Sequence, residues 1–422
     1  MRPRPVRAAT VLIVALAGCG APASGPDVPE RVFTGPLPSP LPQQPVNPRA
    51  AGPWPGFERD ARHSSSLGVV GPQSAGIRWR RRLEGPVVPG PVVARGEVVY
   101  AASNAGVVHA IDLRTGRDRW RFDAGATYGS DLSTTAPAVL HDQTVLWPGP
   151  RDSLYALTPS GRLRWRVRYG SFVLSPLVGG DDTVYVAEMA GVLHALTLRR
   201  RGPPRERWAL RLGAPTYASP SQASDATIYT TSGSDLVAVR DAGSDGRVRW
   251  RFRTGKLIEV SPAVAPDGTV VTGSNDRFQY GVSPDGRLRW RFDRRILTYS
   301  SPAVTPDGLA YFGDHRGIVT ALDARNGRLL ARYAALRLRP GGPSVGVWTA
   351  PAIDARHDVY FGTRAGHVYG FAVGGRRLFD IDTGATVDSY PALAGDGTLL
   401  IGSTSGLLYA ISGRARSRGD PR

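Results

Sequence analysis

The segment 286–292, GRLRWRF, alternates arginine with leucine, tryptophan and phenylalanine. Basic side chains interleaved with aromatic ones suit a surface that binds nucleic acid, because guanidinium groups contact phosphates while rings stack on bases. Similar strips occur at 162–167 and 247–252, at the spacing of a sequence repeat. A single binding site would not recur in this way, and we therefore expect no nucleic-acid partner.

The same strip also has the period of a β-strand. With a period of two, Leu288, Trp290 and Phe292 share one face, and the three arginines share the other. We predict that the apolar face packs on a neighbouring element while the arginines face solvent or lie along the rim. Tryptophans at equivalent positions are given the same structural docking role: Trp79, Trp120, Trp165, Trp208, Trp250 and Trp290.

Other residues capable of chemistry form no catalytic or metal-binding motif. His109 and His194 occupy a repeat position that holds tyrosine in other units, so we interpret them as strand side chains rather than metal ligands. His315 lies in a turn that could face a channel. No nucleophile elbow or HExxH motif is present, and the Pro-Asp-Gly triplets fit turns better than calcium loops. We predict no catalytic residue, no metal and no cofactor.

The composition is that of a globular protein with an excess of arginine. The chain has 422 residues, 41% of them hydrophobic, and a formal net charge of +18; Lys256 is its only lysine. It is long enough to bury a sizeable core. The use of arginine in place of lysine indicates codon bias, but arginine still favours anionic partners, so an anionic surface polymer stays open as a ligand.

The N-terminus carries export signals. Three arginines precede the apolar run 8–18, which suits a secretory signal peptide and is too short to span a membrane. The run ends in Leu-Ala-Gly-Cys, which resembles the bacterial lipobox, and Cys19 is the only cysteine in the chain. We predict a signal peptide at 1–18, lipidation of Cys19 with a palmitate-type chain, and a proline-rich tether at 19–53. The protein would then be anchored to the periplasmic side of an outer membrane or to the outer face of the cell membrane.

The rest of the chain repeats. Each unit opens at a proline, and the units are about 43 residues long: Pro91, Pro137, Pro176, Pro220, Pro262, Pro302, Pro351 and Pro391. Each unit contains four short alternating segments separated by Gly, Asp and Pro turns, which indicates the four strands of a propeller blade. The first copy of the fourth segment, 77–83, precedes the first unit, and the last unit lacks one. We predict an all-β, eight-bladed β-propeller over 54–412, closed by the N-terminal strand completing the last blade, with a disordered basic tail at 413–422.

One segment carries a family resemblance. Residues 110–120, AIDLRTGRDRW, resemble the A-x-D-x-x-T-G-x-x-x-W repeat of pyrroloquinoline-quinone (PQQ) type propellers, and 321–327 keep most of it. Trp54 to Phe57 with Asp60 and His63 resemble the lead-in of PQQ-like repeat proteins. The enzymes of this family bind a quinone and calcium and often have paired cysteines, which this chain lacks. The lipobox resembles that of the family's lipid-anchored, non-enzymatic scaffolds, which implies a monomeric envelope scaffold, with outer-membrane protein assembly as one role. A quinoprotein-type oxidoreductase is the alternative.

The candidate binding residues lie three positions before each blade's proline. Five consecutive blades place aromatic and carboxylate side chains there, a composition typical of a binding patch: Tyr217, Glu259, Tyr299, Trp348 and Asp388. The other blades have Val88, Thr134 and Val173. The alternative is that these aromatic residues only cap the inner strands. We predict that Tyr299 and Trp348 anchor an envelope protein, and that the long segments 123–135 and 333–349 open on the same face.

Overall fold

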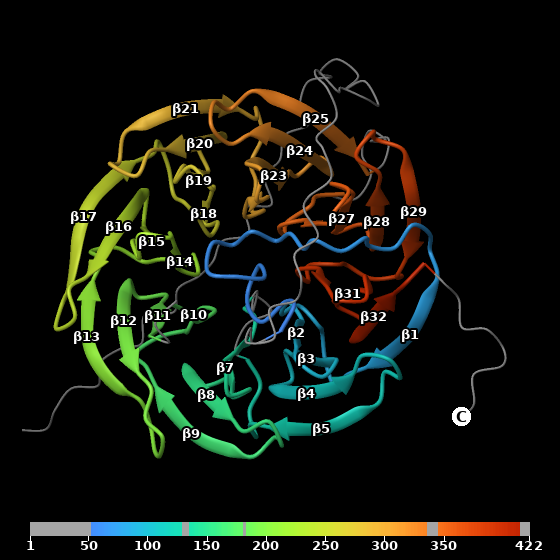
Figure 1. The fold of residues 1–422 in the computed structure, drawn as a ribbon, viewed down its shortest axis with the longest axis horizontal. Helices are drawn as coiled ribbons and strands as arrows, with labels where there is room; N and C mark the ends of the chain where they lie inside the picture. The colour runs from blue at the N-terminus through green and yellow to red at the C-terminus, as the bar shows by residue number, and fades with distance from the viewer. Residues whose placement is uncertain (1–51, 129–134, 180–182, 336–344, 414–422) are drawn as a thin grey trace, which may run out of the picture. The chain divides into compact units, whose positions relative to one another are not determined.

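The computed structural model describes residues 52–128, 135–179, 183–335 and 345–413, all within one compact unit, 31–422. Within these ranges the chain forms eight antiparallel sheets of four strands and no helix, and the sheets are the blades of a ring (Figure 1). The predicted signal peptide, Cys19, almost all of the tether and most of the tail lie outside the described residues. No helix capable of spanning a membrane occurs in the described part of the chain.

The strands follow one another from the inside of each blade to the outside. Seven blades are continuous in sequence: β2–β5 (Val92–Ala94, Val98–Ser103, Val107–Asp112, Asp118–Asp123), β6–β9 (Ala138–Val139, Val145–Gly149, Ser153–Leu157, Leu163–Arg168), β10–β13 (Leu177–Val178, Val184–Glu188, Val192–Thr197, Arg205–Arg211), β14–β17 (Ser221–Gln222, Ile228–Ser232, Asp235–Asp241, Gly246–Arg253), β18–β21 (Ala263–Val264, Val270–Gly273, Phe278–Val282, Leu288–Asp293), β22–β25 (Ala303–Val304, Leu309–Gly313, Ile318–Asp323, Leu329–Ala334) and β26–β29 (Ala352–Ile353, Val359–Gly362, His367–Phe371, Arg377–Asp382).

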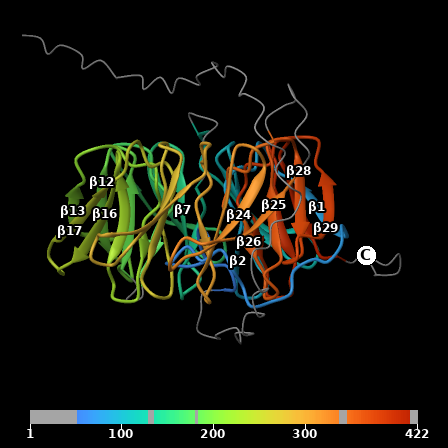
Figure 2. The same cartoon turned by 90° about the horizontal axis from the view of Figure 1, so that it is seen from above.

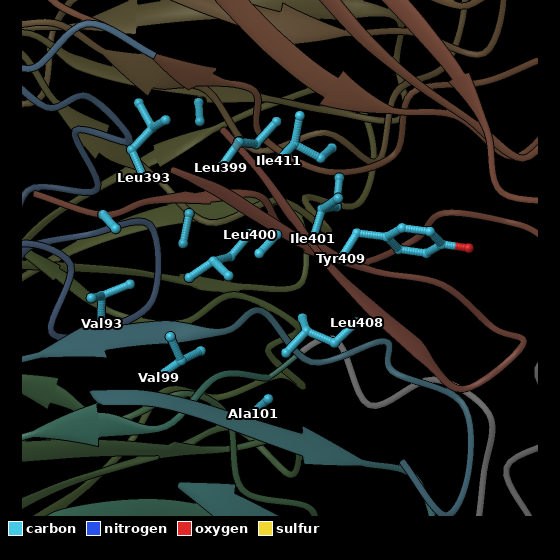
Figure 3. Packing of buried hydrophobic residues seen from close by; sticks show 14 of the residues in the cluster. Val93, Val99, Ala101, Leu393, Leu399, Leu400, Ile401, Leu408, Tyr409 and Ile411 are labelled. Atoms are coloured by element: carbon cyan, nitrogen blue, oxygen red, sulfur yellow. The ribbon is translucent and has the colours of Figure 1, made fainter. Parts of the chain in front are cut away.

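The eighth blade joins the two ends of the ring. Its strands β30–β32 (Ala392–Leu393, Leu399–Gly402, Leu407–Ile411) are completed by β1 (Ile77–Arg82), which pairs antiparallel with β32. An apolar cluster spans this blade and the first one, with Leu400 and Leu408 packed near Val93 and Val99 (Figure 3). The predicted eight-bladed propeller and its closure by the N-terminal strand are therefore confirmed, and backbone pairing and apolar burial both hold the ring shut.

The outer-strand tryptophans lie between blades. Trp290 in β21 is 7% exposed, and its indole N–H donates to the carbonyl of Ala324 in the next blade, at 2.7 Å. A Cβ on Gly327 of that blade would approach the Trp290 ring to 2.7 Å, so glycine is required for this contact. Three other tryptophans donate in the same way to a backbone carbonyl of the next blade: Trp79, Trp120 and Trp250. Trp208 donates instead to Oδ1 of Asp241 in the next blade. Trp165 occupies the equivalent position and is 8% exposed.

The expectation that Leu288 shares the buried face of Trp290 is wrong. Trp290 pairs with Gly281, whereas Leu288 pairs with Val282, so Arg289 is an extra residue that forms a β-bulge. A one-residue bulge reverses the alternation of faces, and Leu288 is 49% exposed in consequence. Phe292 follows the bulge and packs, as predicted, against a buried apolar cluster that includes Phe312 of the next blade. The same shift occurs in the fourth strand of every blade, and it also exposes Leu163 and Val248.

The bulge gives several arginines a structural contact. Arg289 donates to Asp267 and to the hydroxyl of Thr269 in the turn between β18 and β19. Arg164 and Arg249 make the same pair of contacts in their own blades. Each bulged arginine thus ties the outer strand to the first turn of its blade. This contact accounts for part of the arginine content that the sequence alone left unexplained.

The lead-in forms a further structure that we call the axial segment, residues 54–70. It crosses the ring at one end of the channel, as the blue trace in Figures 1 and 2 shows. Its carbonyls accept hydrogen bonds from the inner strands of five blades, through the amides of Val93, Val139, Gln222, Val264 and Ile353. Inner strands have an unpaired edge toward the axis, and the segment supplies partners for it.

Candidate functional site

The five candidate residues lie in the loops that enter the inner strands. Each of the five is partly exposed, whereas the residue immediately before it is buried. These buried residues are Thr216, Ile258, Thr298, Val347 and Val387. The alternation turns one side chain into the blade interface and the next toward the end of the channel opposite the axial segment. Val88 and Val173 are buried at the equivalent positions, and Thr134 lies outside the described residues.

Four side chains form what we call the aromatic cluster: Tyr299, His315, Trp348 and Arg364. The ring of Tyr299 lies 5.0 Å from that of Trp348, centroid to centroid, in an edge-on arrangement. The His315 ring stacks on Trp348 at 5.3 Å and contacts Tyr299 at 5.0 Å. The guanidinium of Arg364 lies 3.8 Å from the centroid of the Trp348 ring, which is close for a cation–π contact. Two entry loops and two turns between second and third strands therefore meet at this end of the channel.

Carboxylates border the aromatic cluster on both sides. Arg364 Nε lies 3.8 Å from Asp388 Oδ2. On the other side, Asn275 donates from Nδ2 to Glu259 Oε2 at 2.5 Å, and burial together with the charge of Glu259 raises the pKa of Tyr299. Burial also raises the pKa of Asp388, and Arg364 opposes part of that shift. The cluster thus combines apolar rings with one cation between two acidic groups.

The surroundings of the His315 ring favour its neutral form. Burial lowers its pKa, and the positive charges of Arg364 and Arg294 lower it further. Its Nε2, together with Trp348 Nε1 and Asp388 Oδ1, is shielded from solvent and has no hydrogen-bond partner among the described residues. A buried polar atom without a partner costs about 1–3 kcal/mol. Three such atoms at one cluster mark it as a place where the fold is not optimised for its own stability.

The structure brings together four of the five predicted residues. Tyr299 and Trp348 touch, and Glu259 and Asp388 flank them. Tyr217 is partly exposed, and within the described ranges no ring contact links it to the cluster. The sequence indicates His315 only as a turn residue that could face the channel. Arg364 is not among the residues predicted from the sequence. Its place in the turn before β28 matches that of His315 before β24, so the repeat offers a signal for it.

The strand residues His109 and His194 contact carboxylate side chains. His109 is 2% exposed and lies 2.7 Å from Glu84 and 3.3 Å from Asp118. His194 has each ring nitrogen 2.7 Å from a glutamate, Glu188 or Glu206. Within the described ranges no group of three or more His, Cys, Asp or Glu side chains is placed to hold a metal ion. We derive no metal or quinone chemistry from these residues.

A second buried pair lies in the axial segment. Glu58 and His63 are both buried, with His63 Nδ1 3.7 Å from Glu58 Oε2. Nδ1 also lies 2.9 Å from the carbonyl oxygen of Pro262, to which it donates. Burial raises the pKa of Glu58 and lowers that of His63 to about 4, so burial favours the neutral form of both groups.

Comparison with known sequences gives one family. The family model described as outer membrane protein assembly factor BamB matches residues 65–127, 104–202 and 197–417. The protein of that name from Burkholderia pseudomallei is 28% identical over 123 residues, which are 28% of this chain and 29% of the relative. The one from Bordetella pertussis is 36% identical over 95 residues, 22% of each chain. The aligned regions span less than a third of the length of these relatives.

Comparison with solved structures gives the same fold. BamB from Moraxella catarrhalis superposes with a TM-score of 0.61 and 18% identity, covering 80% of this chain and 99% of that structure. The quinohemoprotein alcohol dehydrogenase from Comamonas testosteroni gives 0.64 and 14%, covering 89% and 83%. At these identities the likeness shows the fold alone, and the fold is shared by an assembly factor and an enzyme.

Proposed function

Because the chain belongs to the family of outer membrane protein assembly factor BamB, we propose that it is a non-enzymatic scaffold that binds an envelope protein during outer-membrane protein assembly. The observation that carries this proposal is the aromatic cluster. Tyrosine, tryptophan and arginine are the residues that contribute most to binding at protein interfaces, and here they converge from separate blades.

The chemistry of the cluster favours a protein partner. Trp348 and Tyr299 are rigid, partly exposed anchors that offer apolar area at a low cost in conformational entropy. Arg364 can pair with an acidic group of the partner, and Glu259 and Asp388 can receive basic ones. The three polar atoms that have no partner within the described residues would gain from a rearrangement of the cluster on binding.

Anchoring by a lipid on Cys19 is part of the same proposal. Lipidation at the lipobox would anchor the chain to the membrane, and the proline-rich tether, extended at about 3.1 Å per residue, would let the propeller stand up to about 100 Å from it. A single acyl chain binds a membrane only marginally, but the modified cysteine of bacterial lipoproteins carries more than one chain, which would be enough for stable anchoring. We propose that the propeller acts as a monomer tethered to the membrane.

The test is complementation in the organism that carries the gene. A deletion strain is expected to lose outer-membrane β-barrel proteins from its envelope, and the wild-type chain to restore them. The double variant Tyr299→Ala and Trp348→Ala should accumulate normally but fail to restore them. Tyr217→Ala is the control and should complement fully, because Tyr217 occupies the equivalent position of another blade but lies outside the aromatic cluster. Equal complementation by both variants would contradict the assigned surface, and unchanged β-barrel proteins in the deletion strain would contradict the assembly role.

A further inference from the structure

A cavity of about 800 Å³ lies beside the axial segment, at the ends of the inner strands away from the aromatic cluster. Its wall consists of residues 59–62 and 64 of the axial segment and of residues from the blades β10–β13, β14–β17, β18–β21 and β22–β25. This volume is that of a site for a small molecule or a few residues of peptide. The proposed function makes no use of this cavity.

The cavity contains an unpaired backbone edge. The last residue of each inner strand turns its amide toward the axis, and the axial segment bonds to that amide in the two blades before β22: Gln222 N–H donates to Ala61 and Val264 N–H donates to Arg62. In β22 the equivalent residue is Val304. Its neighbour Thr305 bonds back to Leu309, so the Val304 amide points away from β23. Val304 lines the cavity, and its N–H has no partner in the described ranges.

The axial segment leaves this edge open by turning inward. The carbonyl of Arg62 accepts a hydrogen bond from β18, and the carbonyl of Ser65 accepts one from β26. Between them the backbone is left-handed at His63, with a φ of 57°, and again at Ser65, with a φ of 43°. Left-handed conformations are unfavourable for residues other than glycine. The bond from His63 to Pro262 holds the inward turn in place. Within the described ranges the axial segment therefore makes no backbone hydrogen bond to β22, although it bonds to the inner strands of the blades on both sides, β18 and β26.

The cavity wall contains one positive charge that no carboxylate of the wall compensates. Asp60 accepts hydrogen bonds from the Arg59 side chain, the Ser64 hydroxyl and two backbone amides. Asp241 accepts from Arg207 and is likewise compensated. The guanidinium of Arg62 is exposed and has no partner among the described side chains. The remaining wall is largely apolar, with Ala61, Ala223, Val264, Pro266 and Pro306.

We propose that this cavity binds the carboxyl terminus of an extended peptide whose last side chain is small and apolar. The terminal carboxylate accepts a hydrogen bond from Val304 N–H, in the place that a carbonyl of the axial segment takes in the neighbouring blades. It pairs at the same time with Arg62, because a charge-assisted bond favours a carboxylate over a neutral carbonyl. The last side chain lies on the prolines of the wall. Backbone pairing at an edge and capture of a carboxylate are both established modes of peptide recognition.

Val304 N–H can be observed directly. The purified protein is labelled with ¹⁵N-valine, and the Val304 signal is assigned by its loss in Val304→Ile. N-acetyl-Ala-Ala-Val with a free carboxylate is expected to shift this signal saturably, with a Kd at or below about 1 mM. Val178 occupies the equivalent place in β10 but lies outside the cavity wall, so its signal should stay in place. A shift of Val178 as large as that of Val304 would overturn the proposal.

Matched ligands and variants complete the test. The same peptide with a C-terminal amide, and acetate alone, should each bind at least tenfold more weakly than the acid peptide. Arg62→Gln keeps the backbone carbonyl that serves Val264 and should weaken the acid peptide tenfold or more, with Arg62→Lys intermediate. Arg287→Gln, an exposed arginine in the outer strand region, should change nothing. Equal binding of acid and amide, equal binding of acetate, or an unchanged affinity in Arg62→Gln would each refute the site.

Discussion

The contact between Trp290 and the next blade should account for a large share of local stability. An aromatic side chain buries about 150–250 Å² on folding, and at about 25 cal/mol per Å² this is worth about 5 kcal/mol. Trp290 is almost fully buried, and its indole N–H satisfies the Ala324 carbonyl. Trp290→Ala is expected to destabilise the protein by about 3–5 kcal/mol.

The assay is thermal and urea unfolding of the purified protein. Unfolding entropy is about 2.1 cal/mol/K per residue, so for a propeller of about 360 residues that unfolds as one unit, each kcal/mol shifts Tm by about 1.3 °C. Trp290→Ala should then lower Tm by about 4–7 °C. An unchanged Tm and urea midpoint would refute the docking role of this residue.

Glycine variants separate packing from backbone strain. Gly327 has a φ of 72°, and an added Cβ would lie 2.7 Å from the Trp290 ring; Gly308 has a φ of 89° and no atom within 4 Å. Gly308→Ala should cost only the left-handed penalty of about 1–2 kcal/mol, and Gly327→Ala that penalty plus the clash. In the Trp290→Ala background the two glycine variants should cost the same. If Gly327→Ala remained the more costly there, the clash would not be with Trp290.

Three further predictions concern the bulge, the axial segment and the N-terminus. Leu288→Lys should leave Tm unchanged because the bulge exposes this side chain, whereas Phe292→Lys should lower it by several degrees; equal losses would contradict the bulge. The pKa of His63 is about 4 in the fold and about 6.5 when unfolded, so the neutral ring contributes stability above pH 6.5 that is lost as the pH falls toward 4. The loss approaches about 3 kcal/mol, and His63→Asn, which tolerates the left-handed φ and can still donate to Pro262, should remove this part of the pH dependence in urea unfolding. Cys19→Ser should move the protein from the membrane fraction to the soluble fraction of the envelope, and retention in the membrane pellet would argue against lipidation.

The fold could be predicted because the repeat is visible in the residues themselves. Eight prolines at near-constant spacing, and a fourth strand that precedes the first unit, determine both the blade number and the closure by β1. The bulge before each tryptophan could not be predicted in the same way. A period of two places Leu288 with Trp290, and only the register with β20 shows that Arg289 is an extra residue.

The candidate site was predictable in part for a related reason. The repeat predicts that Tyr299 and Trp348 are close, because both lie three residues before the proline of their blades and equivalent positions of neighbouring blades lie at the same end of the channel. Arg364 comes from a different turn, and its position over the Trp348 ring depends on how two loops converge in space. The axial segment bonds mainly through backbone carbonyls, which carry no signature in residue type, so its course across the inner strands became visible only in the structure.

Site-specific crosslinking tests the central claim most directly, because the chain offers two tyrosines in equivalent positions. A photoreactive phenylalanine analogue is placed at Tyr299, within the aromatic cluster, or at Tyr217, outside it, and the protein is irradiated in the native envelope. We expect one envelope protein to crosslink at position 299 and not at 217, and this crosslink to disappear in Trp348→Ala. Crosslinks of equal strength at both positions, or a crosslink at 299 that persists without Trp348, would contradict the assignment of this surface.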